Sequence, residues 1–179
     1  MTYDEFIAEL EEYNINIEAL PELLIKELSL KSLKIATAES CTGGLISKMI
    51  TDVSGASAVF DCGVCSYANE IKEQVLSVNA EDLKLKGAVS KEVAMQMAEG
   101  VRKLAGADIG ISTTGIAGPT GGSELKPVGT VYIGVSYMDK NYAVLANLAA
   151  KNATRDKIRQ LAALLAIYCG FKAAKGENY

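Results

Sequence analysis

The sequence predicts an α/β fold in which helices cover both faces of a mixed five-stranded sheet. Three observations lead to this prediction. Short apolar stretches of strand length alternate with stretches of helical spacing. Two consecutive strands near the C-terminus are joined by a short polar turn, as in an antiparallel hairpin. No linker, internal repeat or low-complexity tract interrupts the 179 residues, so we expect one α/β domain.

Caps, turns and apolar spacing place the individual elements. The N-terminal half is predicted to contain a helix over 2–13, a helix from 21, a strand over 33–37, a helix from 45 to near 55, a strand over 58–67, a helix over 70–78 and a short helix over 79–87. The C-terminal half is predicted to contain a helix over 90–104, a strand over 107–113, hairpin strands over 130–138 and 142–149, and a final helix from 152 or 154.

Capping residues indicate where the helices of the N-terminal half begin. Thr2 and Glu5 have the spacing of a capping box, and Pro21 is typical of a first helical turn. Asn69 is expected to cap the helix over 70–78. Apolar residues then recur on one face of the second helix and of the helix after the first strand: Leu20, Leu23, Leu24 and Leu28, followed by Leu45, Ile46, Met49, Ile50 and Val53.

The C-terminal half continues the alternation. Ser90 is expected to start a helix whose inward face is Val93, Ala94, Met97, Val101 and Leu104. The stretch over 107–113 is apolar enough for a buried strand, and residues 139–141 form the hairpin turn. The last helix begins at Asn152 or Thr154, and residues 172–179 are expected to be frayed.

Composition limits the classes of partner. The formal net charge is −4 and the basic residues are dispersed, which argues against a duplex nucleic-acid partner. A small anionic ligand held by one or two cations is compatible with this pattern. No apolar stretch reaches bilayer length, and the acidic, amphipathic N-terminus is not a signal peptide, so we expect no membrane partner and a cytoplasmic location. The four cysteines are then expected to be reduced thiols.

The chain contains no histidine, which narrows the chemistry further. Ser-His-Asp and Cys-His catalysis and most zinc sites are excluded. Proton transfer must therefore use lysine, tyrosine, cysteine or a carboxylate. The Cys62-x-x-Cys65 spacing has no second cysteine pair and lies in a strand-like stretch, so we interpret both as strand cysteines and expect no metal site.

The stretch TAESCTGG, residues 37–44, brings several reactive groups to a strand-to-helix junction. Local reasoning favours N-capping by Ser40 or Thr42. Alternatively, Ser40 is a nucleophile whose oxyanion is stabilised by helix N-terminal amides. Cys41 is a rival nucleophile, because a helix N-terminus can lower a thiol pKa.

Lys72 is the most available base in a chain without histidine. Most lysines are solvated surface charges, but one in the first turn of a helix meets an unfavourable dipole that lowers its pKa. A partly desolvated lysine can then activate a serine. Tyr67 lies just before this helix. Arg155 and Arg159 are one turn apart on the last helix and either face solvent or clamp an anion.

A glycine-rich loop follows the strand over 107–113, where open α/β sheets place ligands. Gly115, Gly118, Gly121 and Gly122 would let backbone N–H groups approach an anion. The loop matches neither the P-loop nor the dinucleotide fingerprint, and an ordinary turn explains it equally well.

Taken together, the motifs resemble the C-terminal domain of the CinA family, the nicotinamide mononucleotide (NMN) deamidases of pyridine nucleotide salvage. The resemblance covers about residues 20–170. The matching blocks occur in the family's order and are TAESCTGG (37–44), SGASAVFDCGVCSYANEIK (54–72), GAVS (87–90), TTGIAGPTGGSELKPVGTV (113–131) and RDKIR (155–159).

The resemblance implies a three-layer α/β/α sandwich, usually dimeric, that hydrolyses the carboxamide of NMN to nicotinate mononucleotide and ammonia without a metal or cofactor. By position, Ser40 would be the nucleophile, with Lys72 and Tyr67 as its catalytic partners. Thr42, Gly43 and Ser57 would line the pocket. Ribose and phosphate would be held by Arg155 and by the loop glycines Gly115, Gly118, Gly121 and Gly122.

Residues 1–19 lie outside the resemblance and form an acidic helical extension to the domain over 20–179. Longer family members carry a further N-terminal domain, so the chain resembles the stand-alone form. Two rival functions stay open: a non-catalytic nucleotide-sensing module linked to competence or DNA damage, and a cysteine amidase that uses Cys41.

Overall fold

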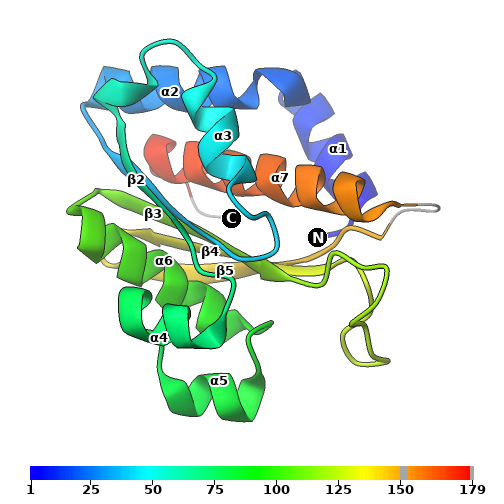
Figure 1. Cartoon of the computed structure of the whole chain (residues 1–179). Helices are drawn as coiled ribbons and strands as arrows, with labels where there is room; N and C mark the ends of the chain where they lie inside the picture. Colours follow the sequence, from blue (N-terminus) through cyan, green and yellow to red (C-terminus); the bar gives the residue numbers. More distant parts are fainter. Residues whose placement is uncertain (150–152, 178–179) are drawn as a thin grey trace.

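A five-stranded sheet forms the middle layer of the protein (Figure 1). The computed structural model describes residues 1–149 and 153–177. The sheet has the order β2-β1-β3-β4-β5, with β1 parallel to β2 and β3 and the remaining pairs antiparallel. Its strands are β1 (Ile35–Glu39), β2 (Phe60–Cys65), β3 (Ile109–Gly115), β4 (Thr130–Tyr137) and β5 (Lys140–Asn147).

Helices cover both faces of the sheet, which confirms the predicted α/β/α sandwich (Figure 1). One face carries α1 (Tyr3–Glu12), α2 (Leu20–Lys31), α3 (Leu45–Thr51) and α7 (Arg155–Lys175). The other carries α4 (Asn69–Leu76), α5 (Ala80–Lys86) and α6 (Lys91–Ala105). Short 3-10 turns precede α2 and β2 at Ile17–Ala19 and Ala56–Ala58. None of the helices in the described ranges combines the length and apolarity that a membrane span requires.

Each face of the sheet buries its own hydrophobic layer. The larger layer lies under α1, α2, α3 and α7, and the smaller one joins β1 to α4, α5 and α6. On the α6 side, Gly110 and Gly134 allow a close approach: a Cβ at either position would lie 2.1 or 2.2 Å from a carbonyl oxygen of α6. The close approach fixes α6 against β3 and β4.

The N-terminal extension is part of the larger hydrophobic layer. Phe6 is fully buried and its ring centroid lies 5.7 Å from that of Tyr168 on α7. Thr2 also forms a parallel bridge with Asn147 of β5. Residues 1–19 therefore pack on the domain, with Met1 and Thr2 beside the C-terminal end of β5, although their separate status as an extension stays a prediction.

Most element boundaries agree with the sequence to within two residues. The predicted hairpin turn over 139–141 is wrong, because Tyr137 pairs with Lys140 and the turn is residues 138–139. The first strand lies at Ile35–Glu39 instead of 33–37, and it includes Glu39, a buried polar residue with hydrogen-bond partners inside the protein. The N-cap of α4 is Ala68 rather than Asn69. Leu104 is 54% exposed, not inward-facing.

The last helix runs further than expected. It begins at Arg155 with Thr154 as its N-cap, and it includes Lys172 and Lys175, which the sequence assigned to a frayed tail. The alternative start at Asn152 and the last two residues lie outside the described residues.

Candidate active site

A small pocket lies where β1, β2 and β3 end. Because these strands are parallel, their carboxyl ends meet at one edge of the sheet, with Glu39 aligned with both Cys65 and Thr113. The pocket has a volume of about 150 Å³. It is lined by Ser40, Cys41, Tyr67, Lys72, Ala88, Val89, Thr114, Gly115, Ala117 and Arg155.

Lys72 lies in the first turn of α4 and reaches the pocket through the protein interior. Its side chain is 1% exposed, and its Nζ donates to the carbonyl oxygens of Ser66 and Tyr67 at 2.6 and 3.3 Å. The third neighbour of Nζ is the Oγ of Ser40, at 3.2 Å. Burial lowers the pKa of Lys72, because desolvation of the ammonium outweighs the smaller opposing influence of Glu70.

The three oxygen neighbours of Nζ fit an ammonium that donates to each of them, and they also fit a neutral amine. A neutral lysine has two N–H donors and one lone pair. The carbonyl oxygens of Ser66 and Tyr67 can take the two donors, which leaves the lone pair directed to the hydroxyl of Ser40. Lys72 is thus placed to accept a proton from Ser40.

Glu39 caps α3, a role that the sequence assigned to Ser40 or Thr42. Its fully buried carboxylate accepts from the backbone N–H groups of Gly44, Ile46 and Ser47 and from the Ser47 hydroxyl, at 2.7–3.1 Å. The N-cap position itself is Gly44, which has no side chain to contribute. Ser40 therefore does not cap α3. The N-terminal amides of α3, which the sequence predicts to stabilise an oxyanion, are already hydrogen-bonded to Glu39.

We expect Glu39→Ala to lower the free energy of unfolding by about 3 kcal/mol or more, because the substitution leaves buried N–H donors without their carboxylate acceptor. For a chain of this size, that corresponds to a Tm lower by roughly 6–12 °C. Glu39→Gln should also destabilise, since its amide N–H₂ would face backbone donors. Urea unfolding tests this, with the exposed Glu73→Ala as a control; equal stability of Glu39→Ala and the control would contradict it.

Cys41 is poorly suited to be the nucleophile. Its side chain is 6% exposed, and burial raises the pKa of its thiol to about 11. Only a small fraction is then thiolate near neutral pH. The sequence interpretation relied on a helix N-terminus to lower this pKa, but Glu39 already occupies that terminus.

Tyr67 and Arg155 form the rim of the pocket. Both are exposed, and Arg155 donates from Nη2 to the Tyr67 hydroxyl at 3.3 Å and from Nη1 to the carbonyl of Gly118 at 2.8 Å. Tyr67 thus contacts Lys72 through its carbonyl oxygen, while its hydroxyl faces Arg155. Within the described residues, Arg155 makes no ion pair, so its charge is available to an anion at the rim.

Of the four loop glycines, only Gly115 lines the pocket. A Cβ there would lie 2.7 Å from Val131 Cγ2, so β4 requires this glycine. Gly118 contacts Arg155, because its carbonyl oxygen accepts a hydrogen bond from the Arg155 guanidinium. Gly121 and Gly122 are exposed and lie outside the lining. Lys126 ties the loop to the opposite wall by donating to the carbonyls of Lys86 and Val89.

Three predicted pocket residues lie elsewhere. Thr42 is fully buried, with its hydroxyl 2.7 Å from that of Thr113. Gly43 is exposed on the turn after Ser40, outside the pocket lining. Ser57 lies in the turn that precedes β2, at the N-terminal end of the parallel strands, whereas Ser40 follows the C-terminal end of β1.

The two cysteines of the C-x-x-C spacing belong to β2, as predicted. Side chains alternate along a strand, so Cys62 and Cys65 point to opposite faces of the sheet. Cys65 is exposed, whereas Cys62 is half-buried. This separation is unlike a metal knuckle, in which both thiolates converge.

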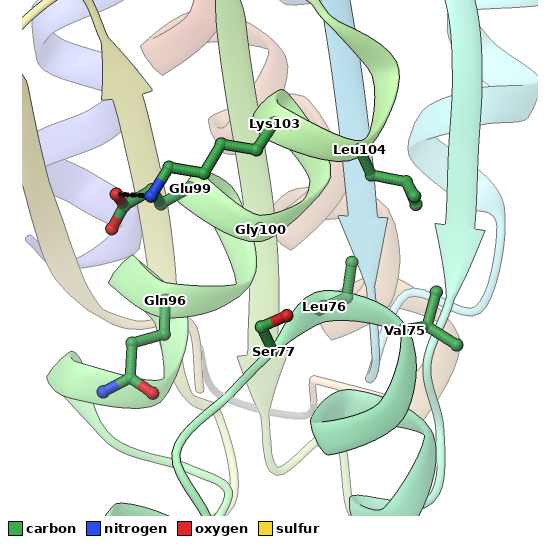
Figure 2. A pocket seen from close by; sticks show the side chains of 8 residues that line it. All are labelled: Val75, Leu76, Ser77, Gln96, Glu99, Gly100, Lys103 and Leu104. Atoms are coloured by element: carbon green, nitrogen blue, oxygen red, sulfur yellow. Dashed lines mark ion pairs between the residues drawn. The ribbon is translucent and has the colours of Figure 1, made fainter.

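Two larger hollows lie away from Ser40. One of about 350 Å³ separates the end of α4 from α6 and contains the Glu99–Lys103 ion pair (Figure 2). The other, of about 830 Å³, lies between α2, α3 and α7. Among the described residues that line them, neither joins a hydroxyl or thiol to a buried base, so the smaller pocket at Ser40 is the candidate active site.

Comparisons with known proteins concern the chain as a whole. The family model described as the CinA C-terminal domain matches residues 17–171. A relative from Thermoanaerobacter pseudethanolicus, whose name designates it as competence-damage inducible, is 52% identical over 155 residues. A CinA-like protein from Kosmotoga olearia is 46% identical over 155 residues. Each match covers 87% of this chain but 37% of the relative, so the chain spans little more than a third of those proteins.

Solved structures extend the likeness to three dimensions. A competence/damage inducible protein from Agrobacterium tumefaciens has a TM-score of 0.81 at 36% identity, covering 89% of this chain and 95% of that one. A CinA superfamily protein from Klebsiella pneumoniae has a TM-score of 0.83 at 29% identity, covering 90% and 99%. The chain belongs to the CinA C-terminal domain family.

Proposed function

We propose that this chain is an NMN amidohydrolase that uses Ser40 as nucleophile and Lys72 as general base. The observation that carries the proposal is the buried Lys72 amine, which lies 3.2 Å from the Ser40 hydroxyl and is directed to it by two carbonyl acceptors. The carboxamide of NMN as substrate follows from the family resemblance described above.

In the proposed reaction, Ser40 Oγ attacks the carboxamide carbon as Lys72 Nζ accepts its proton. The C–N bond then breaks, and Lys72 returns the proton so that nitrogen leaves as ammonia. Water hydrolyses the acyl-enzyme by the same route and releases nicotinate mononucleotide. Lys72 serves both half-reactions because it alternates between acid and base.

The oxyanion would be held by the turn after Ser40 rather than by α3. The N–H groups of Thr42 and Gly43 donate no hydrogen bond within the described residues. By contrast, Glu39 takes the amides of Gly44, Ile46 and Ser47. Like the N–H groups of Thr42 and Gly43, the N–H of Cys41 donates no hydrogen bond in the described ranges. Of these three residues Cys41 is the one that lines the pocket, so its N–H is the unpaired donor nearest to the nucleophile.

The size of the pocket favours partial burial of the substrate. Typical ligand pockets measure roughly 300–1,000 Å³, whereas this one measures about 150 Å³. It suits the carboxamide-bearing ring, while ribose and phosphate would lie at the rim beside Arg155 and Tyr67. In this arrangement Tyr67 contributes its carbonyl to Lys72 and its hydroxyl to the rim.

The direct test is incubation of the purified protein with NMN in the presence of EDTA, with ammonia and nicotinate mononucleotide measured together. We expect equimolar release of both products. Tight NMN binding without ammonia would contradict the proposal and favour the nucleotide-sensing module. The homodimer, the cytoplasmic location and the role in pyridine nucleotide salvage stay predictions.

A further inference from the structure

Arg159 contacts the nucleophile turn from α7. Its Nε donates to the carbonyl of Cys41 at 3.1 Å, and its Nη2 donates to the carbonyl of Thr42 at 2.7 Å. These two carbonyls belong to the first two residues after Ser40. The guanidinium presents its donors in a rigid plane, so one side chain fixes two consecutive peptide groups.

Fixing these carbonyls also fixes the N–H groups behind them. In a trans peptide, the C=O of one residue and the N–H of the next point in opposite directions. The described cis peptide is Gly118–Pro119, away from this turn. The N–H groups of Thr42 and Gly43 therefore point away from Arg159, and neither finds an acceptor in the described part of the chain.

Glu39 and Arg159 thus hold the turn from two sides. The Glu39 carboxylate takes N–H groups on the α3 side, beginning at Gly44. The Arg159 guanidinium takes carbonyls on the α7 side, beginning at Cys41. Ser40 itself is anchored to β3, since its N–H donates to the carbonyl of Thr113 at 3.0 Å.

We infer that Arg159 is a positioning residue for the proposed amidase reaction. It holds the turn after Ser40 so that Ser40 Oγ keeps its contact with Lys72 Nζ. Arg159 acts through the main chain, whereas its neighbour Arg155 would act on the nucleotide. The inference rests on the proposed function for the roles of Ser40 and Lys72, but it does not depend on NMN as the substrate.

A serine-directed fluorophosphonate tests this without NMN. Ser40 Oγ forms a bond to phosphorus, fluoride leaves and the hydroxyl proton passes to Lys72, so the labelling rate reports both activation of Ser40 and stabilisation of the phosphoryl oxygen. The variants are Arg159→Met and Arg159→Lys. Lys157→Met is the matched control, because it removes an exposed cation of the same helix that does not contact the turn.

We expect Arg159→Met to label Ser40 on the order of 10²-fold more slowly than the wild type, because a misplacement of the reacting groups by about 1 Å has an effect of this size. Arg159→Lys should remain slow, because an ammonium lacks the planar pair of donors, and Lys157→Met should label normally. With NMN, kcat of Arg159→Met should fall by a similar factor while KM changes less than threefold. Added methylguanidinium should restore part of the rate in Arg159→Ala.

Labelling and kcat of Arg159→Met within twofold of the wild type would overturn the inference, as would a wild type that is not labelled at Ser40. If Arg159→Met does not fold, a fully active Arg159→Lys would overturn it instead. Arg159-dependent labelling in a protein that releases no ammonia from NMN would sustain the inference while refuting the proposed substrate.

Discussion

Replacing Ser40 by alanine will abolish ammonia release from NMN while leaving nucleotide binding largely intact. Loss of the nucleophile in a coupled nucleophile–base pair is expected to cost on the order of 10⁴–10⁶-fold in kcat. Binding should persist because the rim contacts of Arg155 and Tyr67 do not involve Ser40. Coupled ammonia detection gives the rate, and calorimetric titration with NMN gives the affinity.

Cys41→Ala is the matched control, since it removes the adjacent thiol and keeps Ser40. The buried Cys41 thiol, with its pKa raised to about 11, makes little thiolate, so this variant should retain activity. Full activity in Ser40→Ala would refute the serine mechanism. Inactivity of Cys41→Ala in a folded protein would favour the cysteine amidase.

Replacing Lys72 by methionine should lower kcat by about 10²–10⁴-fold, the usual contribution of a general base. Methionine fills a similar volume but offers no lone pair to Ser40. Lys72→Arg is an informative companion, because arginine keeps the positive charge and cannot deprotonate. Substantial activity in Lys72→Arg would show that charge, rather than proton transfer, is what position 72 supplies.

The pH dependence of the wild type checks the same residue. The neutral amine is the active form, so kcat should rise with pH and level off above the pKa of Lys72. Because burial lowers that pKa from its usual value of 10.5, the rise should occur below pH 10.5. In Lys72→Met this rise should disappear. A wild-type rate that is flat with pH through the whole range of stability would contradict Lys72 as the base.

The fold could be predicted from the sequence because its signals are local. Thr2 with Glu5 and Ser90 cap the helices where they were expected to do so. Alternating strands and helices then led directly to a sheet covered on both faces. The predicted end of the first strand is wrong at Glu39. A carboxylate in a sequence usually indicates a surface position, whereas the fold buries the Glu39 carboxylate against the N-terminus of α3.

The candidate site was predicted only in part, because several of its interactions pass through the main chain. Ser40 and Lys72 were chosen for their side chains, and the structure brings those side chains together. The backbone carbonyls that hold Lys72 carry no sequence signal. Glu39 lies too far before α3 to match a capping pattern, and the Arg159 contacts join positions more than a hundred residues apart.

Lys72 is held by main-chain carbonyl oxygens of Ser66 and Tyr67, and this affects which side chains members of the family can carry at these positions. Every residue type supplies a carbonyl oxygen, so substitution at 66 or 67 leaves the two acceptors of Lys72 in place as long as the backbone keeps its path. The exposed side chain of Tyr67 at the rim can therefore vary without dismantling the base. Position 67 is accordingly a suitable target for directed evolution toward bulkier or differently charged carboxamides, with Lys72 and Ser40 held constant.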